Sequence, residues 1–202
     1  MSSESPSTPY KAPSVAETRR NQLAIPLLVI PPAISAYFAF LSPNAKGLTW
    51  FALHPLLMMV GFFTLGGLST LTKKIGGKAN TELHGTLMFL SSMVAGFATY
   101  VIYAQKEMMG KAHLTTPHAQ FGALTLLLFL GYPVGAYVLY NPDSGLLRTN
   151  QLARKMHKYS GRVILACGIV TCCFGITSME KDPIVAGGMI VSLLACMPFF
   201  LL

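Results

Sequence analysis

Apolar and polar residues occur along the chain in long blocks. Six blocks of mostly apolar residues are separated by short polar segments, at residues 23–41, 48–71, 83–104, 118–140, 157–178 and 183–202. A helix of about 20 apolar residues is long enough to cross a bilayer core of about 30 Å. The pattern therefore predicts an all-α membrane protein with six transmembrane helices, in one domain that covers residues 23–202.

The composition agrees with a surface that faces a lipid bilayer. Of the 202 residues, 52% are hydrophobic and 11% are charged, whereas soluble domains carry about 25% charged residues. Residues 1–22 form a polar tail rich in Ser and Pro, without the apolar core of a secretory signal. The four cysteines all lie in the last two blocks, without the spacing of a zinc site or of covalent haem attachment.

The net charge of +8 is explained by membrane topology rather than by nucleic acid. With six crossings, eleven Lys and Arg residues fall on the side of the N-terminus and four on the opposite side. Cytoplasmic loops carry the excess of basic residues. We therefore expect both termini to be cytosolic, in an integral protein of an endomembrane or organelle membrane.

Four of the five histidines lie at the start of an apolar block, on four consecutive predicted helices: His54, His84, His118 and His157. Because consecutive helices run in opposite directions, His54 and His118 are expected near the non-cytosolic face. His84 and His157 are expected near the cytosolic face. Two histidines at one depth on two helices are the axial ligands that a six-coordinate haem iron needs. The sequence thus predicts one haem iron between the second and fourth helices and another between the third and fifth.

Each histidine taken alone also fits a helix cap or a headgroup contact, but the repeated placement favours the haem interpretation, since ionisable groups at membrane depth are costly. Gly122 and Gly161 lie four residues after His118 and His157. On the same helical face, they would leave room for a flat macrocycle. Tight helix packing through small residues is the alternative explanation for these glycines.

The two membrane faces differ in their candidate substrate residues. Basic residues near the cytosolic pair, among them Lys78, would attract a small anionic reductant. On the other side, His113 precedes the fourth helix outside the apolar block, where it would bind or protonate a substrate. Membrane topology and lipid headgroups explain these loop charges equally well.

Several stretches resemble the two-haem cytochrome b561 family. They are HPLLM at 54–58, KEMMGKAHLTTPHAQFGAL at 106–124 and MHKYSGRVILACGIVTCCFGI at 156–176. The second is similar to the small cytochrome b561 domain-containing transmembrane reductases, whereas TELHGTLMF at 81–89 fits the broader family better.

This resemblance implies two haem b groups in a four-helix haem-binding core made of helices 2–5. It also implies transmembrane electron transfer from cytosolic ascorbate to monodehydroascorbate or a ferric chelate on the opposite side. It implies that Lys78 lies near the ascorbate site and His113 near the acceptor site, and that the enzyme is an ascorbate-dependent oxidoreductase of ferrireductase type.

Two other functions compete with this one. A haem-carrying accessory subunit of a respiratory or photosynthetic complex would keep the fold without independent catalysis. A proton-relaying transporter ranks last, because its broken helices are expected at the midplane, whereas these histidines lie near helix ends. The sequence leaves open whether the chain forms a homodimer or joins a larger membrane complex.

Overall fold

The computed structural model describes residues 15–43, 45–140 and 150–196, with side chains left out at a few positions in the first and fifth helical segments. Six helical segments follow one another, and no strand occurs among these residues. Their bounds are α1 (Val15–Ala36) with η1 (Tyr37–Leu41), α2 (Trp50–Met58) with η2 (Met59–Leu65) and α3 (Gly66–Ile75), α4 (Lys78–Met108), α5 (Pro117–Tyr140), α7 (Gln151–Met179) and α8 (Pro183–Ala195). The predicted all-α fold with six helical segments is confirmed.

Four of these segments are long and apolar enough to cross a membrane: Ala24–Leu41, Trp50–Ile75, Lys78–Met108 and Gln151–Met179. At 1.5 Å per residue, the 24 residues of α5 extend about 36 Å, which also exceeds a bilayer core. Several of the observed helices begin before the apolar blocks, because polar residues continue them beyond the hydrocarbon region. Most of the predicted polar tail, residues 1–14, lies outside the described part of the chain.

The starts of three segments follow from local capping chemistry. Side-chain oxygens of Thr49, Asn150 and Asp182 accept hydrogen bonds from backbone N–H groups in the first turns of α2, α7 and α8, respectively. Such caps satisfy donors that have no partner within the helix. Between α3 and α4, Gly76 and Gly77 have positive φ angles of 82° and 87°, which glycine adopts without steric cost. This turn makes α3 and α4 antiparallel neighbours.

The second segment is continuous but contains a π-helical stretch, η2. Side-chain hydroxyl groups connect η2 to the backbones of its neighbouring helices in two hydrogen bonds. Ser91 of α4 donates to the Gly61 carbonyl at 2.7 Å. Thr64 of η2 donates at 3.0 Å to the carbonyl of Leu27 in α1, which lies four residues before Pro31. Because proline has no N–H, the Leu27 carbonyl needs this second donor within the membrane.

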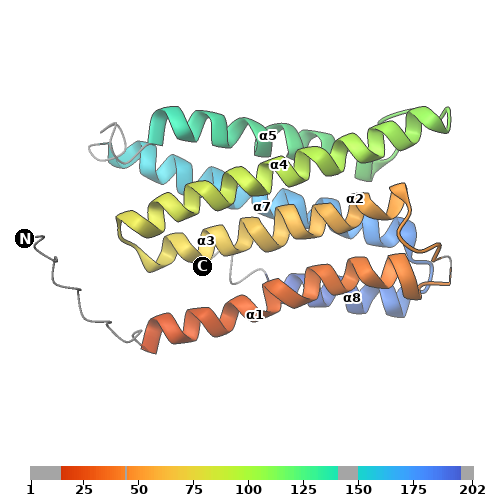
Figure 1. Cartoon of the computed structure of the whole chain (residues 1–202), viewed down its shortest axis with the longest axis horizontal. Helices are drawn as coiled ribbons and strands as arrows, with labels where there is room; N and C mark the ends of the chain where they lie inside the picture. The colour runs from red at the N-terminus through yellow and green to blue at the C-terminus, as the bar shows by residue number, and fades with distance from the viewer. Residues whose placement is uncertain (1–14, 44, 141–149, 197–202) are drawn as a thin grey trace, which may run out of the picture.

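The helices form a four-helix core with two further helices along one side. Segment α2–η2–α3 packs on α4, α4 packs on α5, and α5 packs on α7. Helix α1 packs on η2 and α3, and α8 packs on α7 and α1. Figure 1 shows α1 and α8 together at the lower edge of the bundle, away from α4 and α5. The four-helix core, made of α2–η2–α3, α4, α5 and α7, therefore contains every segment on which a paired histidine was predicted.

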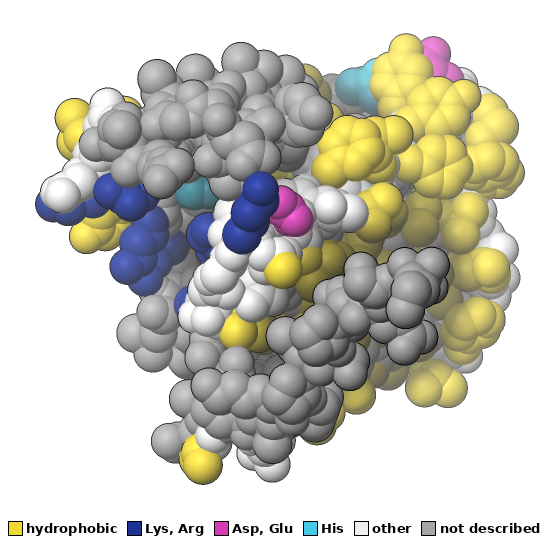
Figure 2. Space-filling model, turned by 60° about the vertical axis from the view of Figure 1, so that its left-hand side comes forward, with side chains coloured by type: hydrophobic (Ala, Val, Ile, Leu, Met, Phe, Trp, Pro, Cys, Tyr) yellow, Lys and Arg dark blue, Asp and Glu magenta, His cyan; other side chains and the backbone are white. Residues whose placement is uncertain are grey.

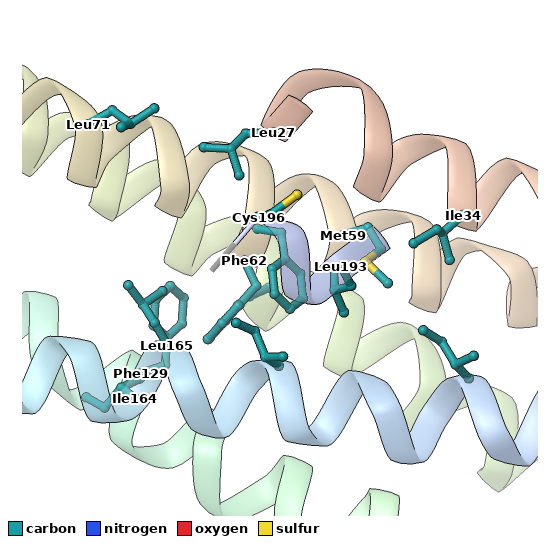
Figure 3. Close-up of a cluster of buried hydrophobic side chains, with 14 of the residues drawn as sticks. Leu27, Ile34, Met59, Phe62, Leu71, Phe129, Ile164, Leu165, Leu193 and Cys196 are labelled. Carbon is teal, nitrogen blue, oxygen red and sulfur yellow. The ribbon is translucent and has the colours of Figure 1, made fainter. Parts of the chain in front are cut away.

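Aromatic rings fill the centre of the four-helix core (Figure 3). The rings of Phe62 and Phe129 lie 4.5 Å apart between centroids, and Phe63 contacts Phe62 at 5.3 Å. All three side chains are buried. Phe62 also packs against α7 at Gly168, where an added Cβ would lie 2.1 Å from the Phe62 ring. This close approach of η2 and α7 requires glycine.

The outer surface divides into an apolar belt and a basic end. Large hydrophobic side chains such as Phe89, Phe97 and Leu127 are exposed, as expected of side chains that face lipid. Figure 2 shows Lys and Arg side chains gathered at one end of the molecule. The basic residues described at the end of α3, the start of α4 and the first half of α7 are Lys73, Lys74, Lys78, Arg154, Lys155, Lys158 and Arg162. The side chains of Arg19 and Arg20, and residues Lys11 and Arg148, lie outside the described part of the chain.

Candidate haem sites

The first histidine pair joins helix α2 to helix α5. The imidazole rings of His54 and His118 are neighbours, with centroids 6.3 Å apart and nearly perpendicular planes, at 81°. The Nδ1 atom of His54 is 2.9 Å from the Ala98 carbonyl, and that of His118 is 2.9 Å from the Thr171 carbonyl. Because a carbonyl only accepts hydrogen bonds, each Nδ1 carries the proton and each Nε2 has a lone pair for a metal.

The second pair joins helix α4 to helix α7. The rings of His84 and His157 have centroids 6.2 Å apart and planes at 88°. The Nδ1 atom of His84 is 3.0 Å from the Ser69 carbonyl and 2.8 Å from the Ser69 hydroxyl. On the other ring, Tyr132 stacks on His157 with centroids 5.2 Å apart and planes at 18°. Side chains of α3 and α5 thus hold the two rings of this pair.

The two pairs lie at opposite ends of the core. Ala98, which binds His54, comes 14 residues after His84 in α4; Thr171, which binds His118, comes 14 residues after His157 in α7. At 1.5 Å per residue, both helices separate the pairs by about 21 Å. Phe62 lies between them, eight residues after His54 and seven before Ser69 in the same continuous segment. The separation is a large part of the thickness of a bilayer core.

Each pair fits an iron held by two imidazoles. A metal–imidazole bond is about 2.0 Å long, so two rings that share one axial metal have centroids about 6 Å apart, as observed here. Carbonyl bonds to Nδ1 are the usual way in which a protein fixes the tautomer of a ligating histidine. Among the described residues no group of three or more His, Cys, Asp or Glu gathers as for a metal held by protein groups alone. The donor set therefore fits haem.

The glycines near the pairs differ in their surroundings. An added Cβ at Gly175 would lie 3.1 Å from Cε1 of His118, so this glycine admits the histidine ring. At Gly122 the added atom would lie 3.1 Å from the Thr171 side chain, whereas at Gly161 nothing lies within 4 Å. The protein leaves open space beside Gly161, and Gly122 contacts α7 directly. A macrocycle contact at Gly122 and Gly161 stays a prediction.

The fifth histidine lies outside both pairs, in the loop between α4 and α5. His113 Nε2 is 2.6 Å from a carboxylate oxygen of Glu107, and its ring stacks on Tyr103 with centroids 4.8 Å apart. Nearby, Lys106 Nζ donates to the Ala112 carbonyl at 3.0 Å. This cluster lies at the same end of the core as the His54–His118 pair, because α4 ends and α5 begins there. Its position suits a surface contact and not an axial ligand.

At the opposite end, the structure separates two lysines that the sequence treats alike. Lys78 forms an exposed ion pair with Glu82 at 3.8 Å. Lys73 donates to the hydroxyl of Thr81 at 2.6 Å, and Thr81 lies three residues before His84 in α4. Lys73 lies one turn after Ser69, the residue that binds His84, and therefore on the same face of α3. The sequence places Lys73 only among the basic residues of this end; its i, i+4 spacing from Ser69 is a signal that pointed to the site.

The family model that describes eukaryotic cytochrome b561 matches residues 53–181. The chain belongs to the cytochrome b561 family. The matched region begins one residue before His54 and ends just after α7, so that it contains both histidine pairs. Membership of this family implies binding of b-type haem, which agrees with the donor set and spacing of the two pairs. It also supports an integral membrane protein, in agreement with the long apolar helices.

The individual relatives share less than a third of their aligned residues with this chain. The chain is 29% identical over 125 residues to the protein named transmembrane reductase CYB561D2 of Mus musculus, an alignment that covers 50% of this chain and 56% of that protein. Against the Homo sapiens protein of the same name the identity is 28% over 125 residues, with the same coverage. The chain thus spans about half the length of the curated relatives it matches.

Proposed function

We propose that this cytochrome b561 is a transmembrane oxidoreductase that moves electrons from a reductant at one membrane face to an acceptor at the other. The observation that carries the proposal is the presence of two histidine pairs of equal ring spacing, 6.3 Å and 6.2 Å, about 21 Å apart along the helices. The names of the relatives, which describe transmembrane reductases, support the same class of activity.

The two pairs would each hold one b-type haem, with His54 and His118 as ligands of one iron and His84 and His157 as ligands of the other. When bound, these groups supply reversible one-electron redox chemistry. The carbonyls of Ala98 and Thr171 fix the ring orientation of the first pair, and Ser69 fixes that of His84. With two imidazoles for each iron, the pairs would support electron transfer and would leave no open position for oxygen.

The reductant is proposed to be ascorbate or a similar small anion. The end of the core with the His84–His157 pair carries the Lys and Arg cluster of α3, α4 and α7 (Figure 2), and clustered charge of one sign attracts the opposite charge and raises its local concentration. Lys73 lies one turn after Ser69, which binds His84, and donates to Thr81 one turn before His84, so it would bind the anion close to the pair. Lys78 lies further out, with Glu82 as its counter-ion.

The acceptor is proposed to be monodehydroascorbate or a ferric chelate at the opposite end. There the imidazole of His113, with a carboxylate oxygen of Glu107 at 2.6 Å, would contact the acceptor. Lys106 and Lys111 give this loop a positive charge, which would hold an anionic chelate or radical anion.

The orientation follows from the distribution of basic residues. With six membrane crossings, eleven Lys and Arg residues of the sequence would fall on the side of the termini and four on the other, so both termini and the reductant site would face the cytosol. The acceptor site would then face the interior of an endomembrane compartment or the equivalent side of an organelle.

The first experiment is an absorbance spectrum of the detergent-purified protein with haem quantified per chain, before and after addition of ascorbate. Two b-type haems per chain, both reduced by ascorbate, are expected. His118→Ala and His157→Ala should each lower the haem content from two to one, and His113→Ala, the matched control on the loop, should keep two. A folded protein without haem would refute the proposal.

A second experiment tests direction across the membrane and the accessory-subunit alternative. Liposomes that contain the purified protein and trapped ascorbate should reduce an external ferric chelate, whereas liposomes without protein should not. If two haems are present but ascorbate reduces neither and the liposomes are inactive, the protein is a haem-carrying subunit that depends on another donor.

A further inference from the structure

Tyr132 of α5 contacts the imidazole of His157 face to face. The two rings are nearly parallel, at 18°, with centroids 5.2 Å apart. An imidazole turns about its last side-chain bond unless a neighbour restricts it, because this torsion has broad preferences. A flat ring stacked against it restricts this rotation and therefore determines the plane that His157 presents to His84.

The hydroxyl of Tyr132 binds the backbone that carries His157. It donates to the His157 carbonyl at 2.8 Å and contacts the hydroxyl of Ser160. Ser160 in turn donates to the Met156 carbonyl at 2.5 Å. One side chain thus fixes the ring of His157 through its face and the surrounding helical turn through its hydroxyl.

Backbone carbonyls contribute to the orientation of the paired histidines. His54, His118 and His84 each have a backbone carbonyl within 3.0 Å of this atom. Helix α5 supplies His118 to one pair and, 14 residues later, Tyr132 to the other. A side chain of α5 therefore has an orienting role at the second pair, comparable to the role of the Thr171 carbonyl at the first.

We propose that Tyr132 is a positioning residue that fixes the plane of His157 relative to His84, now 88°, and thereby tunes the haem held by this pair. The inference rests on the proposed two-haem function. Residues that orient a ligand control its geometry and basicity, and both change the redox potential of the metal. The angle between the two axial imidazole planes also determines the position of the low-field EPR line of a low-spin haem.

The test compares Tyr132→Leu, which removes both stack and hydroxyl, with Tyr132→Phe, which keeps the stack. Tyr100→Leu is the matched control, because Tyr100 is also a tyrosine with a stacked neighbour, Phe97 at 6.3 Å, but is exposed on the lipid-facing surface. Redox titration and low-temperature EPR of the full chain are the readouts. Tyr132→Leu should shift the midpoint potential and the low-field line of one haem only, Tyr132→Phe should shift the same signals less, and Tyr100→Leu should change neither.

Unchanged potentials and EPR lines in Tyr132→Leu, with two haems bound, would overturn the inference and leave the proposed function intact. If Tyr132→Leu does not retain both haems, Tyr132→Phe decides: a shift of the signals of one haem supports the inference, and wild-type signals overturn it. Wild-type protein without two b-type haems would refute the proposed function itself, so the two failures are distinguishable.

Discussion

Gly168 allows the closest approach between two helices of the core, and its replacement by alanine should destabilise the protein. The added Cβ would lie 2.1 Å, 2.3 Å and 3.0 Å from three atoms of the Phe62 ring. That ring is buried and is held between Phe63 and Phe129, so it has no free space into which to turn. Overpacking of this kind costs about 1–3 kcal/mol, and contacts this short suggest the upper part of that range.

Alanine also has a better helix propensity than glycine, by about 1 kcal/mol, which offsets part of the cost. The net loss expected for Gly168→Ala is about 2 kcal/mol, which corresponds to about 4–8 °C in Tm for a chain of this size. Gly188→Ala in α8 is the control, because nothing lies within 4 Å of its added Cβ. Its Tm should stay unchanged or rise slightly.

Thermal unfolding in detergent, followed by circular dichroism, gives the comparison. Phe62→Ala in the Gly168→Ala background should show strong coupling, because the clash disappears with the ring. An equal Tm for Gly168→Ala and Gly188→Ala, or additive effects in the double mutant, would refute the packing argument. Gly168 lies one turn before Thr171, which binds His118, so Gly168→Ala should also alter the absorbance or EPR signals of the haem that we propose His118 to hold.

Three further predictions concern the ends of the core and α1. Lys73→Ala should raise the KM for ascorbate, the proposed reductant, more than Lys78→Ala does, because Lys73 is bound to Thr81 one turn before His84 whereas Lys78 forms an exposed ion pair with Glu82. Equal effects in steady-state assays would contradict this. Thr64→Val removes the hydroxyl that donates to the Leu27 carbonyl of α1. It should lower the free energy of unfolding by about 1 kcal/mol, measured as a lower Tm, and an unchanged Tm would mean that another donor replaces the hydroxyl. Backbone N–H and tyrosine O–H donors lower the pKa of Glu180 from its ordinary value of 4.5. The ionised carboxylate therefore stabilises the fold above pH 4.5, and this stabilisation is lost as pH falls through the lowered pKa. Glu180→Gln should make Tm less sensitive to acid, and parallel curves of Tm against pH for the two proteins would exclude this role.

Much of the architecture could be predicted because its determinants are local. Blocks of apolar residues define the helices. Because neighbouring helices are antiparallel, His54 and His118 are expected at one end of the bundle and His84 and His157 at the other. The structure brings these rings together in the two predicted pairs, while their role as haem ligands stays a prediction that the proposed spectra test.

Other features could not be read from the sequence because they depend on contacts between distant residues. The hydroxyl of Thr64 serves a carbonyl 37 residues earlier, and Tyr132 binds a residue 25 positions later. The π-helical turn of η2 depends likewise on Ser91, 30 residues from the carbonyl it binds. Periodicity shows which face of a helix is apolar, but the partner of a single hydroxyl depends on rotation and register between helices.

The two pairs differ in what orients them, and this difference bears on how their redox potentials are set. At the first pair, main-chain carbonyls of α4 and α7 bind His54 and His118, and no substitution of one side chain removes a main-chain carbonyl. At the second pair, the Ser69 carbonyl also binds His84, and the side chains of Ser69 and Tyr132 contribute in addition. Single substitutions can therefore change the environment of the second pair while the helices keep their positions. The pair next to the basic end, where the reductant is proposed to bind, is thus the one whose potential sequence changes can adjust to its donor.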